Sequence, residues 1–156
     1  APFRDYVPVI RYAEVLLNYA EAEVRVNGVT SKAISLLNAV RGRATATGVY
    51  TLADFSTPKD LINAILIERR IEFMAEGKRW GDIHRLALDA DYTTGGIPAK
   101  MAYGNATFAT YNFVTNPALT KNIAAIPYAD YKFLWPIPAD ELARNPTLAA
   151  QQNPGY

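Results

Sequence analysis

Apolar side chains recur at helical spacing through the first ninety residues, and this periodicity constrains the fold more than any other feature of the sequence. A spacing of three or four residues places such side chains on one face of a helix. It predicts helices over residues 8–26, 31–45, 58–76 and 80–90. The residues expected to face the core are Ile10, Ala13, Leu17, Ala20 and Val24 in the first helix, Ala33, Leu36, Leu37, Val40 and Ala44 in the second, Leu61, Ile62, Ile65, Leu66, Phe73 and Met74 in the third, and Ile83, Leu86, Ala87 and Ala90 in the fourth.

Residues that start and stop helices support these boundaries. Gly28, directly after Asn27, supplies a stop for the first helix. The link to the second helix is short, which predicts an antiparallel pair. Thr57 is suited to the N-cap of the third helix, with Pro58 at the first helical position and Asp60 reaching back to close a capping box.

The pattern changes beyond Tyr92, where Gly, Thr, Asn, Pro and aromatic residues follow no helical period. We expect an irregular, aromatic-rich segment over 92–138 and a short last helix over 139–144. Two helix hairpins in succession resemble tetratricopeptide-type repeats. The predicted fold class is therefore mainly α, in a single domain over 1–156. Since helical repeats need about three stacked units to cover their apolar faces, we expect an apolar side that missing upstream helices would cover.

The composition narrows the possible functions. The net charge is +1 at pH 7, and the Lys and Arg residues are scattered singly or in pairs, which argues against a nucleic-acid partner. The absence of cysteine excludes disulfides and thiolate catalysis. Neither a signal sequence nor an apolar run of the ~20 residues needed for a membrane helix is found. The helical pattern begins within ten residues, which indicates the tail of a longer protein.

A row of carboxylates raises the question of catalysis. Glu68, Glu72 and Glu76 share one face of the third helix, and paired carboxylates are the machinery of glycoside hydrolysis. The row is interleaved with the cations Arg69, Arg70, Lys78 and Arg79. A general acid needs a raised pKa, whereas neighbouring cations keep carboxylates ionised. We therefore expect ion pairs, some partly buried, in which arginines bridge helices, and no catalytic residue. A glycoside hydrolase using Glu68 and Glu72 is kept as an alternative.

The remaining candidates for chemistry are a histidine and two tryptophans. His84, the only histidine, has no second histidine and no carboxylate at metal-ligand spacing, so we expect a surface or hydrogen-bonded side chain and no metal site. Trp80 and Trp135 could stack on sugar rings, but Trp80 follows Gly77 and Trp135 precedes a proline, which favours wedges between packed elements. The sequence contains no Gly-rich phosphate loop after a strand and no GxSxG elbow, and we expect no cofactor.

Five segments in this order resemble the C-terminal region of the SusD/RagB family. They are "RYAEVLLNYAEA" (11–22), "LLNAVRGRA" (36–44), "IERRIEFMAEGKRWGDIHR" (67–85), "LWPIPADELARNP" (134–146) and "QNPGY" (152–156). Each segment is moderately specific, and the five together span nearly the whole chain.

The resemblance implies a mainly helical, tetratricopeptide-containing lipoprotein of Bacteroidetes at the outer face of the outer membrane. Such a protein binds a glycan or other nutrient, performs no chemistry on it, and passes it to a SusC-like TonB-dependent transporter. The signal peptide, the lipid-bearing cysteine and the N-terminal helices of the family are expected in an N-terminal segment absent from this chain. An interaction scaffold that docks the transporter, with no ligand site of its own here, is the alternative.

None of the five segments is a ligand signature. If this region contributes to ligand binding, we expect the contribution between residues 92 and 131. Tyr103 and Tyr111 are candidates for stacking on the apolar face of a sugar, with Asn105 and Asn112 meeting its hydroxyls. The alternative is that these tyrosines cover the core.

Overall fold

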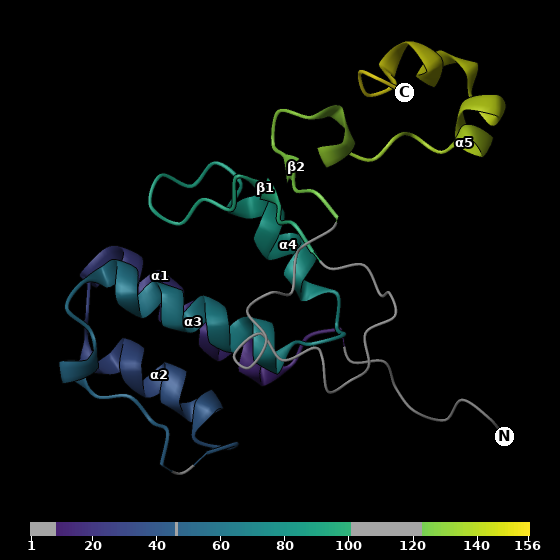
Figure 1. Ribbon diagram of the computed structural model, residues 1–156. Coiled ribbons are helices and arrows are strands. Elements are labelled where there is room, and N and C mark those ends of the chain that lie inside the picture. The colour runs from purple at the N-terminus through teal and green to yellow at the C-terminus, as the bar shows by residue number, and fades with distance from the viewer. Residues whose placement is uncertain (1–8, 46, 101–122) are drawn as a thin grey trace, which may run out of the picture. The chain divides into compact units, whose positions relative to one another are not determined.

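A computed structural model describes residues 9–45, 47–100 and 123–156 (Figure 1). The chain divides into two compact units, whose boundary in the sequence lies between Gly81 and Asp82. Helices dominate the described residues, which confirms the predicted mainly α class. The single domain over 1–156 stays a prediction, and each unit is described here by itself.

The first unit is built on a helix hairpin and a third helix. α1 (Tyr12–Asn27) and α2 (Ser31–Arg41) form the hairpin, and α3 (Pro58–Glu72) packs against both of them (Figure 1). A single 3-10 turn, η1 (Leu52–Asp54), lies between α2 and α3. The core of this unit consists of Leu17, Ala20, Val24, Ala33, Ile34, Leu37, Val40, Phe55, Leu61, Ile62, Ile65 and Phe73.

The predicted stop at Gly28 and the predicted capping box of Thr57 and Asp60 are confirmed, and the structure adds a cap at Thr30. Gly28 follows α1 with φ 75° and ψ −151°, a conformation open essentially to glycine. Thr30 is the N-cap of α2 and accepts a hydrogen bond from the backbone N–H of Ala33 at 3.1 Å. Thr57 and Asp60 form the capping box that begins α3. These local signals therefore fix where α2 and α3 begin.

α1 is shorter at its N-terminal end than predicted. It begins at Tyr12, rather than near residue 8, because Arg11 has extended torsion angles (φ −113°, ψ 152°). Ile10 precedes the helix and is 69% exposed, so its predicted place in the core is wrong. Ala13, in the first turn of the helix, is half-buried.

α2 also ends earlier than predicted, at Arg41 rather than near residue 45. Gly42 closes the helix by donating its N–H to the carbonyl of Asn38 at 2.8 Å. Ala44 lies beyond this end and is exposed, and Leu36 is half-buried, whereas Ile34, which was not predicted to face the core, is buried. The apolar face of α2 is therefore rotated slightly from the predicted one.

The end of α3 is set by the backbone of the following turn. Phe73 has φ −105° and ψ 26°, outside the helical region, and Ala75 has φ 68°, which is uncommon for a residue with a Cβ. The helix therefore stops at Glu72 rather than near residue 76, and Gly77 (φ 76°) lies in the turn that follows. Phe73 is buried as predicted, whereas Met74 is 79% exposed.

α4 (Lys78–Arg85) contains the boundary between the two units. It begins two residues before the predicted start and ends well before residue 90. Ile83, Leu86 and Ala87 are buried as predicted. Ala90 lies past the end of the helix and is exposed, so its predicted core position is wrong.

The second unit contains a small strand pair within the segment predicted to be irregular. β1 (Gly96–Ile97) pairs antiparallel with β2 (Ile126–Pro127), Ile97 opposite Ile126. Two 3-10 turns, η3 (Tyr131–Phe133) and η4 (Pro146–Gln151), and α5 (Ala139–Arg144) complete the described elements. α5 has the bounds that the sequence predicts. A small core contains Ile83, Ala87, Ile97 and Phe133, with Ile126 packed against it.

None of the helices in the described parts of the chain is long and apolar enough to cross a membrane.

Candidate functional site

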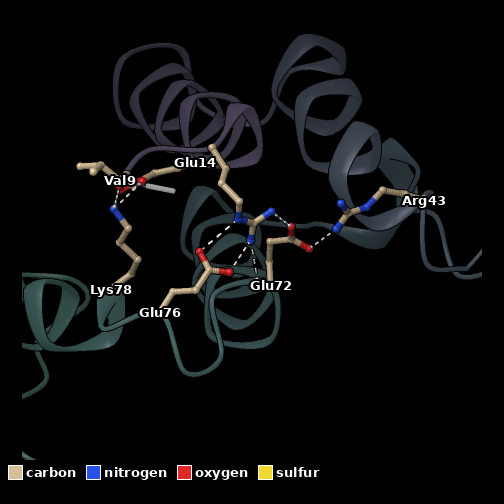
Figure 2. Close-up of polar contacts among 7 residues, drawn as sticks. Val9, Glu14, Arg43, Glu72, Glu76 and Lys78 are labelled. Atoms are coloured by element: carbon tan, nitrogen blue, oxygen red, sulfur yellow. Dashed lines mark hydrogen bonds and ion pairs between the residues drawn. The ribbon is translucent and has the colours of Figure 1, made fainter. Parts of the chain in front are cut away.

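The carboxylates suspected of catalysis are held by arginines from other parts of the first unit. Glu72 accepts hydrogen bonds from Nη1 of Arg11 at 2.7 Å and from Nη2 of Arg43 at 2.5 Å. Glu76 accepts two more from the same Arg11, at 2.7 and 3.0 Å. Nη2 of Arg11 also donates to the backbone carbonyl of Glu72 at 3.0 Å. Arg11 thus pairs with both carboxylates, and Figure 2 shows Glu72 between Glu76 on one side and Arg43 on the other.

The third carboxylate is held in the same manner. Glu68 is only 6% exposed and accepts a hydrogen bond from Nη1 of Arg41 at 2.9 Å. Arg41 also donates to the carbonyl of Gly48 and lies 4.7 Å from the ring centre of Tyr50. We use the name ionic network for Arg11, Arg41, Arg43, Glu68, Glu72 and Glu76.

The electrostatics of the ionic network oppose acid catalysis. Burial by itself would raise the pKa of Glu72, but hydrogen bonds from Arg11 and Arg43 outweigh it and hold that pKa below its ordinary value of 4.5. Hydrogen bonds to Glu76 and Glu72 in turn raise the pKa of Arg11. Glu72 is thus ionised at neutral pH and has no proton to give to a leaving group.

The partners of the carboxylates differ from those that the sequence suggested. Arg69 donates to the side-chain oxygen of Asn18 at 2.5 Å and lies 5.4 Å from the ring centre of Phe73. Lys78 pairs with Glu14 at 2.8 Å and donates to the carbonyl of Val9 at 2.8 Å (Figure 2). The prediction of ion pairs bridging helices is correct, but the bridging arginines come from α1 and α2 and their ends. The sequence feature that could have identified these partners is the presence of Arg41 and Arg43 close together at the end of the second predicted helix.

His84 is half-buried. Its ring stacks on that of Phe133, with ring centres 4.2 Å apart and an interplanar angle of 28°. The nearby Asp82 is buried and pairs with Arg85 at 2.9 Å. Over the described ranges, no three His, Cys, Asp or Glu residues gather closely enough to hold a metal ion.

The two tryptophans differ in burial. Trp80 is 38% exposed, which is compatible with a partial wedge, but Trp135 is 71% exposed. The prediction that Trp135 is wedged between packed elements is therefore wrong. The sequence-based prediction missed that the backbone carbonyl of Trp135 accepts a hydrogen bond from Asn153.

That backbone is held by polar side chains from the end of the chain. Gln152 accepts from the N–H of Ile137 at 2.8 Å and donates to its carbonyl at 3.1 Å. Asn153 donates to the carbonyl of Trp135, and the hydroxyl of Tyr156 donates to that of Leu134 at 2.9 Å. We use the name terminal pairing for these contacts of Gln152, Asn153 and Tyr156 with the backbone of residues 134, 135 and 137.

A glycine makes the terminal pairing possible. Gly155 has φ 94°, and a Cβ added to it would lie 2.6 Å from Cγ of Tyr131. The rings of Tyr131 and Tyr156 meet edge to face, with centres 5.2 Å apart. Any other residue at position 155 would thus be strained and would push Tyr131 away.

The predicted ligand-stacking residues Tyr103 and Tyr111, with Asn105 and Asn112, lie outside the described residues. They stay predictions.

The fold and these contacts define a helical-hairpin protein in which the densest charge cluster joins helices to one another. Comparison with known families then places it: the profile of the SusD family matches residues 4–156, and the chain belongs to this family. "SusD-like protein P2" of Formosa agariphila is 35% identical over 156 aligned residues, which cover 97% of this chain and 26% of that protein. The chain therefore spans about a quarter of the length of this curated relative. No solved structure matches the chain significantly.

Proposed function

We propose that the chain belongs to a non-catalytic protein that binds a glycan or other nutrient at the bacterial cell surface and delivers it to a SusC-like TonB-dependent transporter. The observation that carries this proposal is the SusD family match over residues 4–156. The ionic network supports it, because Glu72, ionised between two guanidinium groups, is unsuited to acid catalysis.

The same resemblance suggests where the protein acts. A lipoprotein attached to the outer membrane through an N-terminal segment outside these 156 residues would hold the chain at the cell surface. The partners would then be an oligosaccharide or other nutrient, the transporter, and N-terminal helices of the same protein. Detection of the protein on intact cells by an antibody, with loss of the signal after protease treatment of those cells, tests this location.

Calorimetric titration of the complete protein with a panel of oligosaccharides and peptides tests the binding function. We expect heat of binding for at least one member and no turnover of any. Uniform absence of binding, together with turnover of one of them, would reject the proposal.

For the ligand site we propose the segment over residues 92–131, with Tyr103 and Tyr111 as stacking residues. Tyr103→Ala and Tyr111→Ala should each weaken the affinity about 5- to 100-fold, the range expected from removing one stacking ring. Tyr103→Phe and Tyr111→Phe are the matched controls, since they keep the rings and should keep most of the affinity. Equal affinity in the Ala variants and the wild type would reject these two residues.

The second candidate function is an interaction scaffold that docks the transporter. It is favoured by exposed apolar residues on α3 and in the turn after it, where Ile67 and Ile71 of the helix are 54% and 62% exposed and Met74 of the turn is 79% exposed. In this case Ile71→Asp should abolish co-purification with the transporter and leave the affinity for nutrient unchanged. The control is Asn63→Asp, which places the same charge on an exposed position of the same helix.

The alternative of a glycoside hydrolase using Glu68 and Glu72 predicts turnover that Glu68→Gln abolishes. Both carboxylates accept hydrogen bonds from arginines, which disfavours the acid role. Failure of the wild-type protein to hydrolyse any glycan of the panel would reject this alternative.

A further inference from the structure

α1 has an apolar row on each of two opposite faces. One row, with Leu17, Ala20 and Val24, is buried in the core of the first unit. The other row points away from it: Tyr12, Val15, Tyr19 and Val26 are 74%, 48%, 46% and 81% exposed, and Ala22 is exposed as well. We use the name outer seam for Tyr12, Val15, Tyr19, Ala22 and Val26. A helix with two apolar faces is typical of helices that are covered on both sides.

The spacing within the outer seam identifies the kind of element that fits it. Its positions follow one another at intervals of three, four, three and four residues, which is the repeat of a helix-to-helix seam. A second helix crossing at a small angle meets all of these positions in turn. An extended strand repeats every two residues and would lose register with the seam.

A hollow beside the seam has the size of a side chain. It measures ≈ 260 Å³, and its mostly apolar lining consists of Tyr12, Ala13, Leu16, Ala39 and Val40, with Arg11 and Arg43 of the ionic network beside them. This volume is below the usual range of pockets for small ligands, which begins at about 300 Å³. It suits one large apolar side chain inserted from a helix that lies along the seam.

The charges of α1 are balanced within the first unit. The pairs are Glu14 with Lys78 at 2.8 Å, Glu21 with Arg25 at 3.0 Å, and Glu23 with Lys32 at 3.6 Å. Lys32 also lies 4.4 Å from the ring centre of Tyr19, in the middle of the seam. Because its charged neighbours already have partners, the outer seam offers mainly apolar contact, which suits the apolar face of another helix.

We propose that the outer seam is covered by an amphipathic helix of the same polypeptide, from the portion that lies outside these 156 residues. The length of the curated relative supports this source, since this chain matches only 26% of it. Helical hairpins bury such faces against neighbouring hairpins of their own chain. The proposal is independent of nutrient binding and concerns only what lies on α1.

The absence of cysteine from the chain allows a direct test. Val15→Cys places a single thiol in the outer seam, and Val49→Cys is the matched control, since Val15 is 48% and Val49 44% exposed in the same unit. The rate of maleimide labelling is measured in the 156-residue chain and in the complete polypeptide, with any other cysteine replaced by serine. We expect labelling of Cys at position 15 to be at least 10-fold slower in the complete polypeptide, and labelling at position 49 to be equal in both.

Other outcomes would overturn the proposal. Fast labelling at position 15 in the complete polypeptide means that nothing covers the seam. If labelling at position 15 becomes slow only after the transporter is added, the transporter covers the seam. If labelling of the 156-residue chain becomes slower as the concentration of that chain is raised, a second copy covers it. If labelling is slowed equally at positions 15 and 49, the protection is not specific to the seam. Val26→Cys, at the opposite end of the seam, repeats the test if Val15→Cys impairs folding.

Discussion

The ionic network of the first unit and the terminal pairing of the second both join residues that are distant in the sequence, but they use different chemistry. In the ionic network, Arg11 reaches Glu72, 61 residues away, through charged hydrogen bonds. In the terminal pairing, Gln152 reaches Ile137 through two hydrogen bonds between neutral groups. Both sets of contacts lie in segments that carry the resemblance to the SusD family, so residues in these family segments stabilise the fold.

The difference between the two sets of contacts concerns their response to pH and salt. Charged groups titrate, and exposed pairs are screened by salt. Amide, hydroxyl and backbone groups do not titrate between pH 3 and 9, and a buried neutral hydrogen bond depends little on ionic strength. The first unit should therefore lose stability in acid through the ionic network, whereas the terminal pairing should not contribute to that loss.

The largest effect is expected beside the ionic network, at Arg69. Arg69 is 5% exposed, donates to Asn18 and lies 5.4 Å from the ring centre of Phe73, so Arg69→Ala removes this hydrogen bond and leaves the space of a large buried side chain unfilled. We expect a loss of about 2–4 kcal/mol in the free energy of unfolding, measured with urea. The neighbouring Arg70 is exposed, and Arg70→Ala should change little. Equal losses for the two variants would show that burial does not distinguish them.

Glu72→Gln sharpens the comparison through its pH dependence. The change should lower the free energy of unfolding by about 1–2 kcal/mol at pH 7, because two charged hydrogen bonds weaken. The pKa of Glu72 is lowered in the folded state, so its contribution is fully present above its ordinary pKa of 4.5 and is lost as the pH falls through the lower folded value.

The difference between wild type and Glu72→Gln should therefore shrink as the pH falls below 4.5. Urea unfolding at a series of pH values from 7 to 3 measures it. A difference that stays constant over this range would contradict the role given to the ionised carboxylate.

Gln152→Ala tests the terminal pairing. The change removes both hydrogen bonds to Ile137 and should cost about 1 kcal/mol. Hydrogen exchange at the amide of Ile137 should be faster in the variant, by a similar factor at pH 4 and pH 7 after correction for the intrinsic rate. Gln151→Ala changes an exposed neighbour and is the control. An effect of Gln152→Ala that appears only at one pH would mean that the terminal pairing also depends on charge.

The smallest effect is expected for Trp135→Ala, in the same part of the second unit. The ring is 71% exposed, and the backbone carbonyl of this residue accepts a hydrogen bond from Asn153 that the change leaves intact. The free energy of unfolding should change by less than about 0.5 kcal/mol, measured by thermal and urea unfolding. A loss above about 1.5 kcal/mol would instead support the sequence-based prediction that Trp135 is wedged between packed elements.

Local rules account for the parts of the fold that the sequence predicted well. The N-caps Thr30 and Thr57 and the stop at Gly28 depend on residues within a few positions, as does α5. The end of α3 was not predictable in this manner, because Ala75 adopts a positive φ that its side chain does not favour. Tertiary contacts of Glu72 and Glu76 with Arg11 accompany this turn.

The candidate site likewise has features that the sequence predicts and features that depend on tertiary contacts. The sequence indicated that the carboxylates would be ionised and paired, but their partner Arg11 lies 61 and 65 residues away, and no local pattern joins such positions. It also placed Trp135 in the interior, since an aromatic residue among apolar neighbours is usually buried. The residues that hold this segment, Gln152 and Asn153, have no periodicity that could have identified them.

The sequence by itself determined the helices, their start signals and the membership of the SusD family, because periodicity, capping and family motifs are written in consecutive residues. The tertiary structure alone decided which arginine holds which carboxylate, where α3 stops, and that α1 keeps a second apolar face, the outer seam, outside the core of the first unit. The physical reason is that these features depend on how helices distant in sequence meet, and the free energy of those contacts outweighs local preference.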